Sequence, residues 1–320
     1  MKSITARNVN HAFMDAWHYL AVAGVKETSR NGEVLAVPGP VCTTFTHPQE
    51  RVLFNPKRDA NPVFHLMEAI WCMAGEAGVA WLSQFNSRYV EYAEPNGFVH
   101  GAYGRRWFDW WGVDQVFRVI LTLKENKDSR QAVLTMWDPM DDSIGKWRDR
   151  PCNTHVYFDC RNSQLNMTVC CRSNDMLWGA YGANVVVFSF LQEVIAHELG
   201  VPMGGYRQFS NNFHVYTDLP QVQEFLATPP METFDAYDTV KPYPILRGSE
   251  SLENLRRDCI KLVNGDRFNP KTDFIAQIAQ PLCNMYLSRK RGANIYPEKL
   301  PECDWVVAFQ QWLERRNGSK

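Results

Sequence analysis

Three short segments of the chain contain residues that could do chemistry on a small anionic ligand. They are Arg150-Pro151-Cys152-Asn153, Arg172-Ser173-Asn174-Asp175 and His214-Val215-Tyr216. Cys152 is a candidate nucleophile, because a thiolate attacks carbon and nearby arginines stabilise the thiolate form. Arg172 and Ser173 can bind a phosphate group through several hydrogen bonds. The combination indicates attack on a nucleotide base while its phosphate and sugar are held.

Each segment also has an ordinary structural explanation. Most cysteines are buried and inert, and an Arg-Ser pair at a strand end is commonly a solvated turn. His214 and Tyr216 stand two residues apart, so in a strand both side chains face the same way and could bind one sugar hydroxyl. Half-buried strands often carry such a pair without any ligand. The segments therefore gain weight only in combination.

Two further polar residues lie in apolar surroundings. Glu68 is on the inward stripe of an apolar helical pattern near Trp71, where a carboxylate is costly unless it is paired or functional. A buried cation could be its partner. Asn184 precedes a strongly apolar segment; it could cap a helix, or its amide could pair with the edge of a base.

Composition limits the class of protein. The chain has 320 residues, of which 45% are hydrophobic, and this is typical of one large globular domain or two small ones. The formal net charge of −1 provides no global positive field, so direct binding of nucleic acid is not expected. Nine cysteines without a Cys-x-x-Cys pair indicate a reducing, cytoplasmic location and no metal site.

No membrane association is expected either. The longest apolar stretch, 185–196, is too short to span a bilayer and contains Gln192 and Glu193. The first residues do not have the pattern of a signal peptide.

Hydrophobic periodicity predicts four helices in the first two thirds of the chain, at 10–23, 62–74, 114–125 and 185–199. Asn61 and Pro62 suit the start of the second helix, and Gly200 suits the end of the last. Strands are predicted at 132–137, 155–160, 165–172 and within 203–216. The second and third strands flank the turn 161–163 and should form a hairpin. The pattern is α+β: a mostly antiparallel sheet with a long buried helix and surrounding helices.

The region beyond residue 220 has a less regular sequence pattern. It is rich in proline, and Pro229-Pro230 and Pro242–Pro244 predict irregular connections. Helices are expected near 252–264 and 303–315. Because no linker, repeat or low-complexity run is present, we treat residues 1–320 as a single domain with a C-terminal extension at about 221–320.

Taken together, the motifs resemble the thymidylate synthase superfamily, and within it the pyrimidine nucleotide hydroxymethylase branch. The resemblance runs from about Arg30 to Tyr216 and implies a thymidylate synthase-like fold. It is carried by the three segments above, by Asn184, and by Arg30-Asn31-Gly32, His65–Trp71, Ala102–Trp107 and Asp128-Ser129-Arg130. These occur in the order that the family has.

The resemblance implies a folate-dependent one-carbon transfer. Cys152 would add to C6 of a pyrimidine, so that C5 attacks the methylene of the co-substrate 5,10-methylenetetrahydrofolate. Tetrahydrofolate then departs, and an exocyclic methylene stays on the base. A synthase reduces this methylene with a hydride, whereas a hydroxymethylase adds water. Glu68 would position the water and relay protons.

The resemblance also assigns roles to individual residues. Catalytic roles fall to Cys152, Glu68, Tyr103 and Asp175. Substrate-binding roles fall to Arg30, Arg130, Arg172, Ser173, Asn184, His214, Tyr216 and Asn153. Contacts with folate fall to Trp71, Tyr89, Asp175 and Gly179. Arg130 is expected to reach the phosphate site of the partner subunit in a homodimer, and no metal is implied.

Several departures from the synthase pattern favour the hydroxymethylase branch. Asn153 follows the nucleophile where synthases have histidine, and Cys171 precedes the Arg-Ser pair where they have glutamine. Tyr89 takes the place of a tryptophan that shields the methylene from water. Gln131 replaces the second arginine of the cross-subunit pair. The chain ends in the polar residues 315–320 rather than in a short apolar tail, and loss of that cover would also admit water.

The base remains open at this point. An asparagine amide pairs with uracil in one orientation and with cytosine when flipped, and Asn153 is a candidate for fixing Asn184. The Asn-for-His change and the Arg-Ser-Asn-Asp segment favour dCMP, with dUMP as the alternative. Arg130 and Ser173 resemble the deoxynucleotide forms, which indicates a deoxypyrimidine monophosphate.

Three other functions are alternatives for this sequence. The first is ordinary thymidylate synthase, and the second is an inactive nucleotide-binding homologue, against which joint retention of the motifs argues. A zinc deaminase is not supported, because no His-x-Glu with Pro-Cys-x-x-Cys is present. Modified nucleotides would suit a virus, and the location would then be the host cytoplasm.

Overall fold

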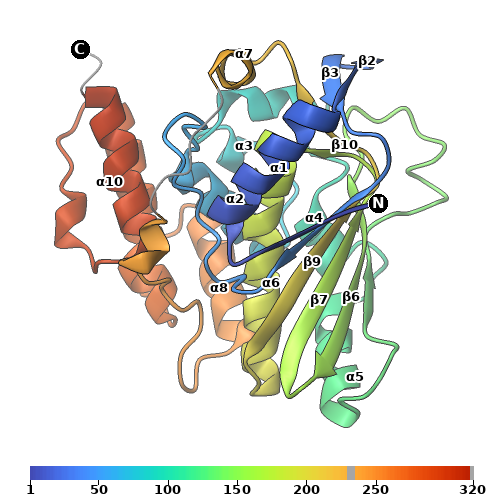
Figure 1. Cartoon of the computed structure of the whole chain (residues 1–320). Helices are drawn as coiled ribbons and strands as arrows, with labels where there is room; N and C mark the ends of the chain where they lie inside the picture. The colour runs from blue at the N-terminus through green and yellow to red at the C-terminus, as the bar shows by residue number, and fades with distance from the viewer. Residues whose placement is uncertain (229–234, 318–320) are drawn as a thin grey trace.

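A six-stranded mixed sheet forms one wall of the molecule (Figure 1). The computed structural model describes residues 1–228 and 235–317, so the predicted Pro229-Pro230 connection and the last three residues lie outside the described part. The strand order across this sheet is β1 (Lys2–Ala6), β4 (Val41–Phe45), β9 (Met203–Ser210), β7 (Gln164–Cys171), β6 (Asn153–Arg161), β5 (Val133–Thr135). Strands β1 and β4 pair in parallel, as do β7 and β9, and the other three pairings are antiparallel.

The predicted hairpin is present as β6 and β7. Its turn residues Asn162 and Ser163 both have positive φ, 53° and 58°, the backbone conformation that matches the twist of a tight hairpin. Pairing continues from Arg161 opposite Gln164 to Asn153 opposite Cys171, with a register shift at the Asn153 end. The hairpin therefore joins the residue after the nucleophile to the residue before Arg172.

A smaller four-stranded sheet brings together segments that are distant in sequence. Its order is β2 (Val25–Ser29), β3 (Gly32–Ala36), β10 (Phe213–Tyr216), β8 (Asn174–Asp175). His214 lies opposite Ala36 on one side and Asp175 on the other. Arg30 and Asn31 form the tip of the β2–β3 hairpin, whose return at Gly32 has φ +124°.

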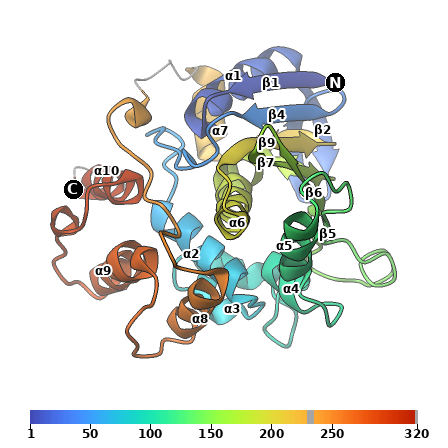
Figure 2. The same ribbon diagram turned by 90° about the horizontal axis from the view of Figure 1, so that it is seen from below.

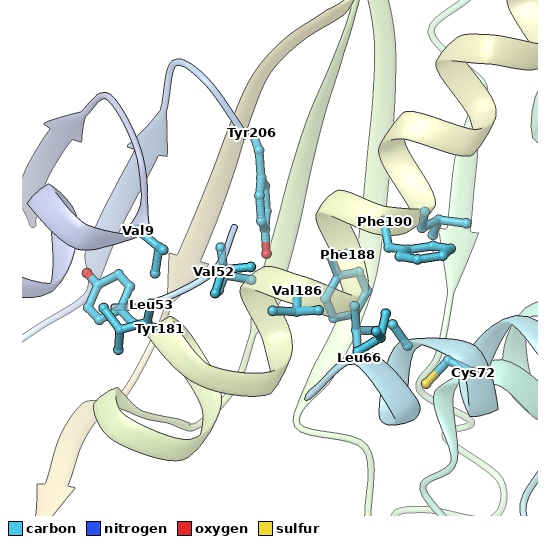
Figure 3. Packing of buried hydrophobic residues seen from close by; sticks show 14 of the residues in the cluster. Val9, Val52, Leu53, Leu66, Cys72, Tyr181, Val186, Phe188, Phe190 and Tyr206 are labelled. Atoms are coloured by element: carbon cyan, nitrogen blue, oxygen red, sulfur yellow. The ribbon is translucent and has the colours of Figure 1, made fainter. Parts of the chain in front are cut away.

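The long helix α6 (Asn184–Leu199) lies at the centre of the fold, as predicted (Figure 2). Val186 and Phe188 lie between Leu66 of α2 (Pro62–Ala74) and Tyr206 of the sheet, and Phe190, further along α6, packs against Phe274 (Figure 3). Gly200 ends α6 in the left-handed conformation, as expected for a helix C-terminus. The stretch 176–199 is long and apolar enough to cross a membrane, but 83% of its apolar window is buried inside the protein. Its apolar character is that of a core helix.

Helix α2 positions a second part of the site. The Asn61 side chain accepts a hydrogen bond from Phe64 N at 3.2 Å and caps the helix, and Pro62 fills its first turn. Helix α4 (Tyr103–Phe108) crosses it closely, since a Cβ on Gly104 would lie 2.1 Å from the Cys72 carbonyl oxygen. The other helices of this part are α1 (Val9–Ala23), α3 (Val79–Leu82), η1 (Ser87–Tyr92) and α5 (Gln115–Glu125).

The residues after 220 pack onto the same core. The predicted helices near 252–264 and 303–315 are present, and the helices of this region are α7 (Pro220–Ala227), α8 (Leu252–Val263), α9 (Gln280–Lys290) and α10 (Asp304–Asn317). Leu255 and Phe309 belong to the hydrophobic cluster that contains α2 and α6. Ile245 N donates to Glu193 Oε1 of α6 at 2.9 Å, and Arg316 of α10 pairs with Asp59 at 2.7 Å. The extension is thus attached through both apolar and ionic contacts.

Candidate active site

A cavity of about 790 Å³ opens between the smaller sheet and the end of the β6–β7 hairpin. Five residues predicted to bind substrate line it: Arg30, Arg172, Ser173, His214 and Tyr216. The structure therefore brings together residues that span more than half of the chain. Arg150, Trp137 and Asn212 also line it, and sequence reasoning assigned none of these three to substrate binding.

Three arginines in this cavity have no carboxylate partner among the residues that the structure describes. Arg172 donates to the Pro151 and Arg150 carbonyl oxygens at 3.0 and 3.3 Å. Arg30 contacts only the Asn31 side chain, and Arg150 donates only to the Gly145 carbonyl. Asp142 lines the same cavity, but buried Arg106 engages both of its carboxylate oxygens. Uncompensated positive charge of this kind favours an anionic ligand.

His214 and Tyr216 provide groups suited to a hydroxyl. His214 is buried, with 6% of its surface exposed, and burial lowers the pKa of its ring, so the ring is neutral at pH 7. Its Nδ1 lies 2.7 Å from Asn212 Oδ1, an acceptor, which places the proton on Nδ1 and leaves Nε2 to accept a hydrogen bond. Asn212 is therefore the residue that orients the imidazole.

Cys152 lies at the start of the hairpin, beside Arg172. The Arg172 amide donates to the Cys152 carbonyl oxygen at 2.8 Å, and its guanidinium Nη2 lies 3.8 Å from Sγ. Burial raises the pKa of the Cys152 thiol, Arg172 and Arg30 oppose this, and Asp149 adds to it. The thiol is therefore protonated at neutral pH in the free protein, and its activation needs a change in its surroundings.

Glu68 is held by a tyrosine. Tyr89 OH donates to Glu68 Oε1 at 2.9 Å, while Oε2 is buried without a partner among the described residues. Burial raises the pKa of Glu68 to about 7; the hydrogen bond from Tyr89 lowers it and the charge of Asp149 raises it. Trp71 lies beneath Tyr89 with ring centroids 6.1 Å apart, and its Nε1 donates to the Gly78 carbonyl.

A chain of hydrogen-bonded side-chain amides begins at Asn153, the residue after Cys152. Asn153 Nδ2 donates to Tyr103 OH at 2.8 Å and to Asn184 Oδ1 at 3.0 Å. Asn184 Nδ2 donates in turn to Asn174 Oδ1 at 3.0 Å, and Asn174 Nδ2 donates to Gln208 Oε1. These partners fix the orientation of the Asn184 amide. Asn184 is the first residue of α6 and not its cap, which is Ala183, so the explanation as a helix cap was wrong; pairing of the Asn184 amide with a base stays a prediction.

Asp175 and Gly179 lie where the chain turns from β8 into α6. Asp175 Oδ1 accepts from Trp178 N at 2.6 Å, whereas Oδ2 is buried without a described partner. Burial raises the pKa of Asp175. A Cβ on Gly179 would lie 2.6 Å from Asn174 Oδ1, so only glycine allows this approach.

One carboxylate of the site was missed by sequence reasoning. Asp149 Oδ2 accepts from Gly101 N at 3.2 Å, and the Asp149 charge contributes to raising the pKa of Cys152, Glu68 and Tyr103. In the sequence Asp149 stands between Arg148 and Arg150 and looks like part of a solvated run of charges. Its position became evident only from the packing of the loop against Gly101.

Arg130 does not join this cavity. Its side chain is exposed in the turn after α5. It forms no hydrogen bond or ion pair with a residue that the structure describes. The same residues contain no group of three or more His, Cys, Asp or Glu side chains placed to hold a metal ion.

Comparison with known proteins identifies the family. Residues 11–244 match the family described as thymidylate synthase. A deoxyuridylate hydroxymethyltransferase of Pseudomonas phage M6 is 38% identical over 100% of this chain and 95% of its own length. A protein of the same name from Bacillus phage SP01 is 35% identical over 59% of this chain and 54% of its own length. A thymidylate synthase of Corynebacterium aurimucosum is 27% identical over 66% of this chain and 76% of its own length.

The chain therefore belongs to the thymidylate synthase family, on the side of its hydroxymethylase branch. It is an enzyme of the folate-dependent one-carbon transferase class. The family implies a reduced folate as co-substrate, and the residues present fit one. The buried, unpartnered oxygens of Glu68 and Asp175 are acceptors for the N–H groups of a pterin or for water.

The pH dependence of turnover tests the Tyr89–Glu68 pair. With the carboxylate form ordering water, kcat should rise with pH through about 7, where Glu68 ionises. Glu68→Gln should remove this transition and lower kcat by roughly 10²–10⁴-fold. Tyr89→Phe removes a hydrogen bond that stabilises the carboxylate, so the transition should move to higher pH. A pH–rate profile that is unchanged in Tyr89→Phe, or moved to lower pH, would contradict this assignment.

The charge of Asp149 can be tested by chemical labelling. Asp149→Asn keeps an oxygen for Gly101 N but removes a negative charge near Cys152, so the pKa of the thiol should fall. Alkylation of the Cys152 peptide by iodoacetamide, followed by mass spectrometry, should then be faster at neutral pH. Asp266→Asn, an exposed change in the extension, is the control. Equal rates in both variants would show that Asp149 acts only through the backbone contact.

Proposed function

We propose that the protein is a deoxyuridylate 5-hydroxymethyltransferase, which adds a hydroxymethyl group to C5 of dUMP. The observation that carries the hydroxymethyl product is the hydrogen bond from Tyr89 to Glu68, at 2.9 Å. A tyrosine hydroxyl stands where the synthase pattern has a tryptophan, beside a carboxylate with a free, buried oxygen. A polar pocket of this kind can order a water molecule next to the exocyclic methylene.

The choice of base differs from the preference that the sequence motifs gave. The motifs favoured dCMP, whereas the phage relatives are named for deoxyuridylate, including one that matches this chain over its whole length. The amide chain supports selection of a single base, because Asn153 and Asn174 hold both ends of the Asn184 amide. A fixed amide pairs with uracil or with cytosine but not with both. We therefore propose uracil, and dCMP stays as the alternative that the product assay distinguishes.

The residues would act in sequence. Arg30, Arg172 and Ser173 hold the phosphate, and His214 with Tyr216 hold the sugar hydroxyl. Cys152 adds to C6 as a thiolate, and the guanidinium 3.8 Å away stabilises the charge. The co-substrate, 5,10-methylenetetrahydrofolate, supplies the one-carbon unit.

Proton movements complete the reaction. C5 would attack the methylene carbon of the co-substrate, beside Tyr103 and Asn153. A water molecule held by Glu68 would take the proton from C5, and the C–N bond to the folate would break. Tetrahydrofolate leaves with that electron pair and takes up the proton, and an exocyclic methylene stays on the base. Glu68 Oε2 accepts a hydrogen bond from the water that adds to this methylene, and takes its proton. The enolate that results re-forms the C5=C6 double bond, and Cys152 leaves C6 as a thiolate with the electron pair of the broken C–S bond. Trp71, Tyr89, Asp175 and Gly179 are proposed to face the folate, Asp175 through its unpartnered Oδ2.

We also propose that the enzyme is a homodimer, built through the open face of the large sheet. The helices gather on the other face (Figures 1 and 2). On the open face Tyr157 is 46% exposed, and Phe209 and Cys170 are partly exposed. Polar side chains such as Thr168 and Arg207 share this face. An uncovered sheet face that mixes exposed aromatic and polar residues suits an isologous contact. Arg130, exposed and outside the cavity of its own subunit, would reach the partner's phosphate site.

We propose that the enzyme acts on its small-molecule substrates in the cytoplasm, which is that of the host if the source is viral.

A mass-spectrometric product assay tests the reaction. With methylenetetrahydrofolate and dUMP, the nucleotide should gain CH2O, and dCMP should remain unchanged. Gain of CH2O on dCMP would reverse the base, and gain of CH2 would identify a methylating synthase. Cys152→Ala should abolish product while nucleotide binding is kept, since only the nucleophile is removed. Full activity of that variant would overturn the mechanism, and lack of product from either nucleotide would favour an inactive binding protein.

Subunit complementation tests the role of Arg130. Arg130→Gln and Cys152→Ala should each be weakly active or inactive alone, because every site lacks one group. Co-expressed with different affinity tags, they should regain activity in the hybrid dimer. One site there combines an intact Cys152 with the partner's Arg130. A hybrid no more active than the two homodimers would show that Arg130 does not act across subunits.

A further inference from the structure

The phosphate site contains an arginine for which neither the motifs nor the comparisons assign a role. The resemblance provides two arginines from the partner subunit at this site, but the second position is Gln131 in this chain. A nucleotide monophosphate carries close to two negative charges at neutral pH, so loss of one cation should weaken its binding unless another replaces it. A cation outside the assigned set would have to line the same cavity.

Arg150 meets this description. It lines the cavity together with Arg30, Arg172 and Ser173. The Arg172 guanidinium donates to the Arg150 carbonyl oxygen at 3.3 Å, so the two residues are direct neighbours in space although 22 positions apart. Arg150 comes from the loop immediately before Pro151 and Cys152, which fixes its distance from the nucleophile.

The guanidinium of Arg150 is only partly satisfied. One Nη donates to the Gly145 carbonyl, and Nε is buried without a partner among the described residues. No described carboxylate forms an ion pair with it. Among the buried arginines of the described residues, Arg51 pairs with Glu193 and Arg106 with Asp142, and Arg58 donates twice to the Leu177 carbonyl oxygen. A half-buried arginine with free donors is costly unless a ligand completes its hydrogen bonds.

We propose that Arg150 binds the substrate phosphate within its own subunit. It would thereby take over the role of the second cross-subunit arginine of the family, which is Gln131 in this chain. This inference rests on the proposed function only in taking a nucleotide monophosphate as the ligand, and it does not depend on the base. Glu27 and Asp142 also line the cavity, but Asp142 is already held by Arg106. The phosphate would thus meet three cations from one subunit, Arg30, Arg150 and Arg172, and one, Arg130, from the partner.

Two other roles for Arg150 are distinguishable. It could hold the loop through Gly145, in which case its loss would affect nucleotide and nucleoside alike. It could stabilise the thiolate, but the pKa of Cys152 responds to burial, Arg172, Asp149 and Arg30. Only a phosphate contact predicts an effect confined to ligands that carry a phosphate.

Isothermal titration calorimetry on the full chain, without folate, tests the proposal. Arg150→Gln should raise the Kd for dUMP about ten- to a hundredfold, the loss expected for one charge-assisted hydrogen bond. Deoxyuridine, measured by competition, should bind equally to wild type and variant. Arg150→Lys keeps the charge but not the planar guanidinium, so its Kd for dUMP should lie between those of wild type and Arg150→Gln. Arg148→Gln, which removes the same charge two residues away outside the cavity, should bind dUMP as wild type does.

The outcomes separate this inference from the proposed function. If wild type binds dCMP and not dUMP, the same comparison is made with dCMP and deoxycytidine, and only the base assignment changes. If wild type binds neither monophosphate, the proposed function and the inference both fail. If Arg150→Gln binds the monophosphate as wild type does, or loses nucleotide and nucleoside equally, the proposal for Arg150 is wrong. Arg150→Lys and the thermal melting temperature of each variant show whether any loss comes from unfolding.

Discussion

The pairing of β6 with β7 is the constraint on which the site depends. Its tight turn sets the register, and the register brings the residues at its open end together. There the Arg172 amide binds the Cys152 carbonyl at 2.8 Å, and the guanidinium reaches Sγ. A slip of one residue would turn both side chains to the other face of the sheet. Strand β9 pairs in parallel with β7, and β10 follows β9 in the chain. His214 of β10 therefore lines the same cavity.

Charge is divided between two ends of the site. The mouth carries arginines without carboxylate partners, whereas Glu68, Asp149 and Asp175 lie deeper, and burial raises the pKa of each. Burial also raises the pKa of the Cys152 thiol, and Arg172 only partly offsets this effect. The free enzyme thus keeps a neutral nucleophile, and the pKa of Glu68 is about 7. Ligand binding, which removes water and adds charge at the mouth, must change these protonation states for the reaction to begin.

The amide chain supplies rigidity where the base should lie. Asn184 and Asn174 are bonded at both the oxygen and the nitrogen of their amides, and the chain ends on buried Gln208 and Ser210. Asn153 is bonded through Nδ2, while its Oδ1 is buried without a partner among the described residues. A flip of the Asn184 amide would place two donors, or two acceptors, against each other at both of its contacts. The extension adds to this support from outside. Arg58, whose guanidinium donates to Leu177 O at 2.8 Å, precedes Asp59, which binds Arg316 of α10.

The sequence by itself determined the elements and the motif residues. Helices at 62–74 and 185–199, the 155–172 hairpin and the extension helices follow from local periodicity and cap residues, which depend on backbone geometry alone. Motif order also identified Arg30, Cys152, Arg172 and His214 as one site. Only the tertiary structure revealed Asp149, Arg150 and Asn212, because a charged or amide side chain looks alike in a solvated loop and in a cavity wall. The state of Glu68 and of the Cys152 thiol was likewise decided by packing, since a pKa depends on burial and on charges brought close from distant parts of the chain.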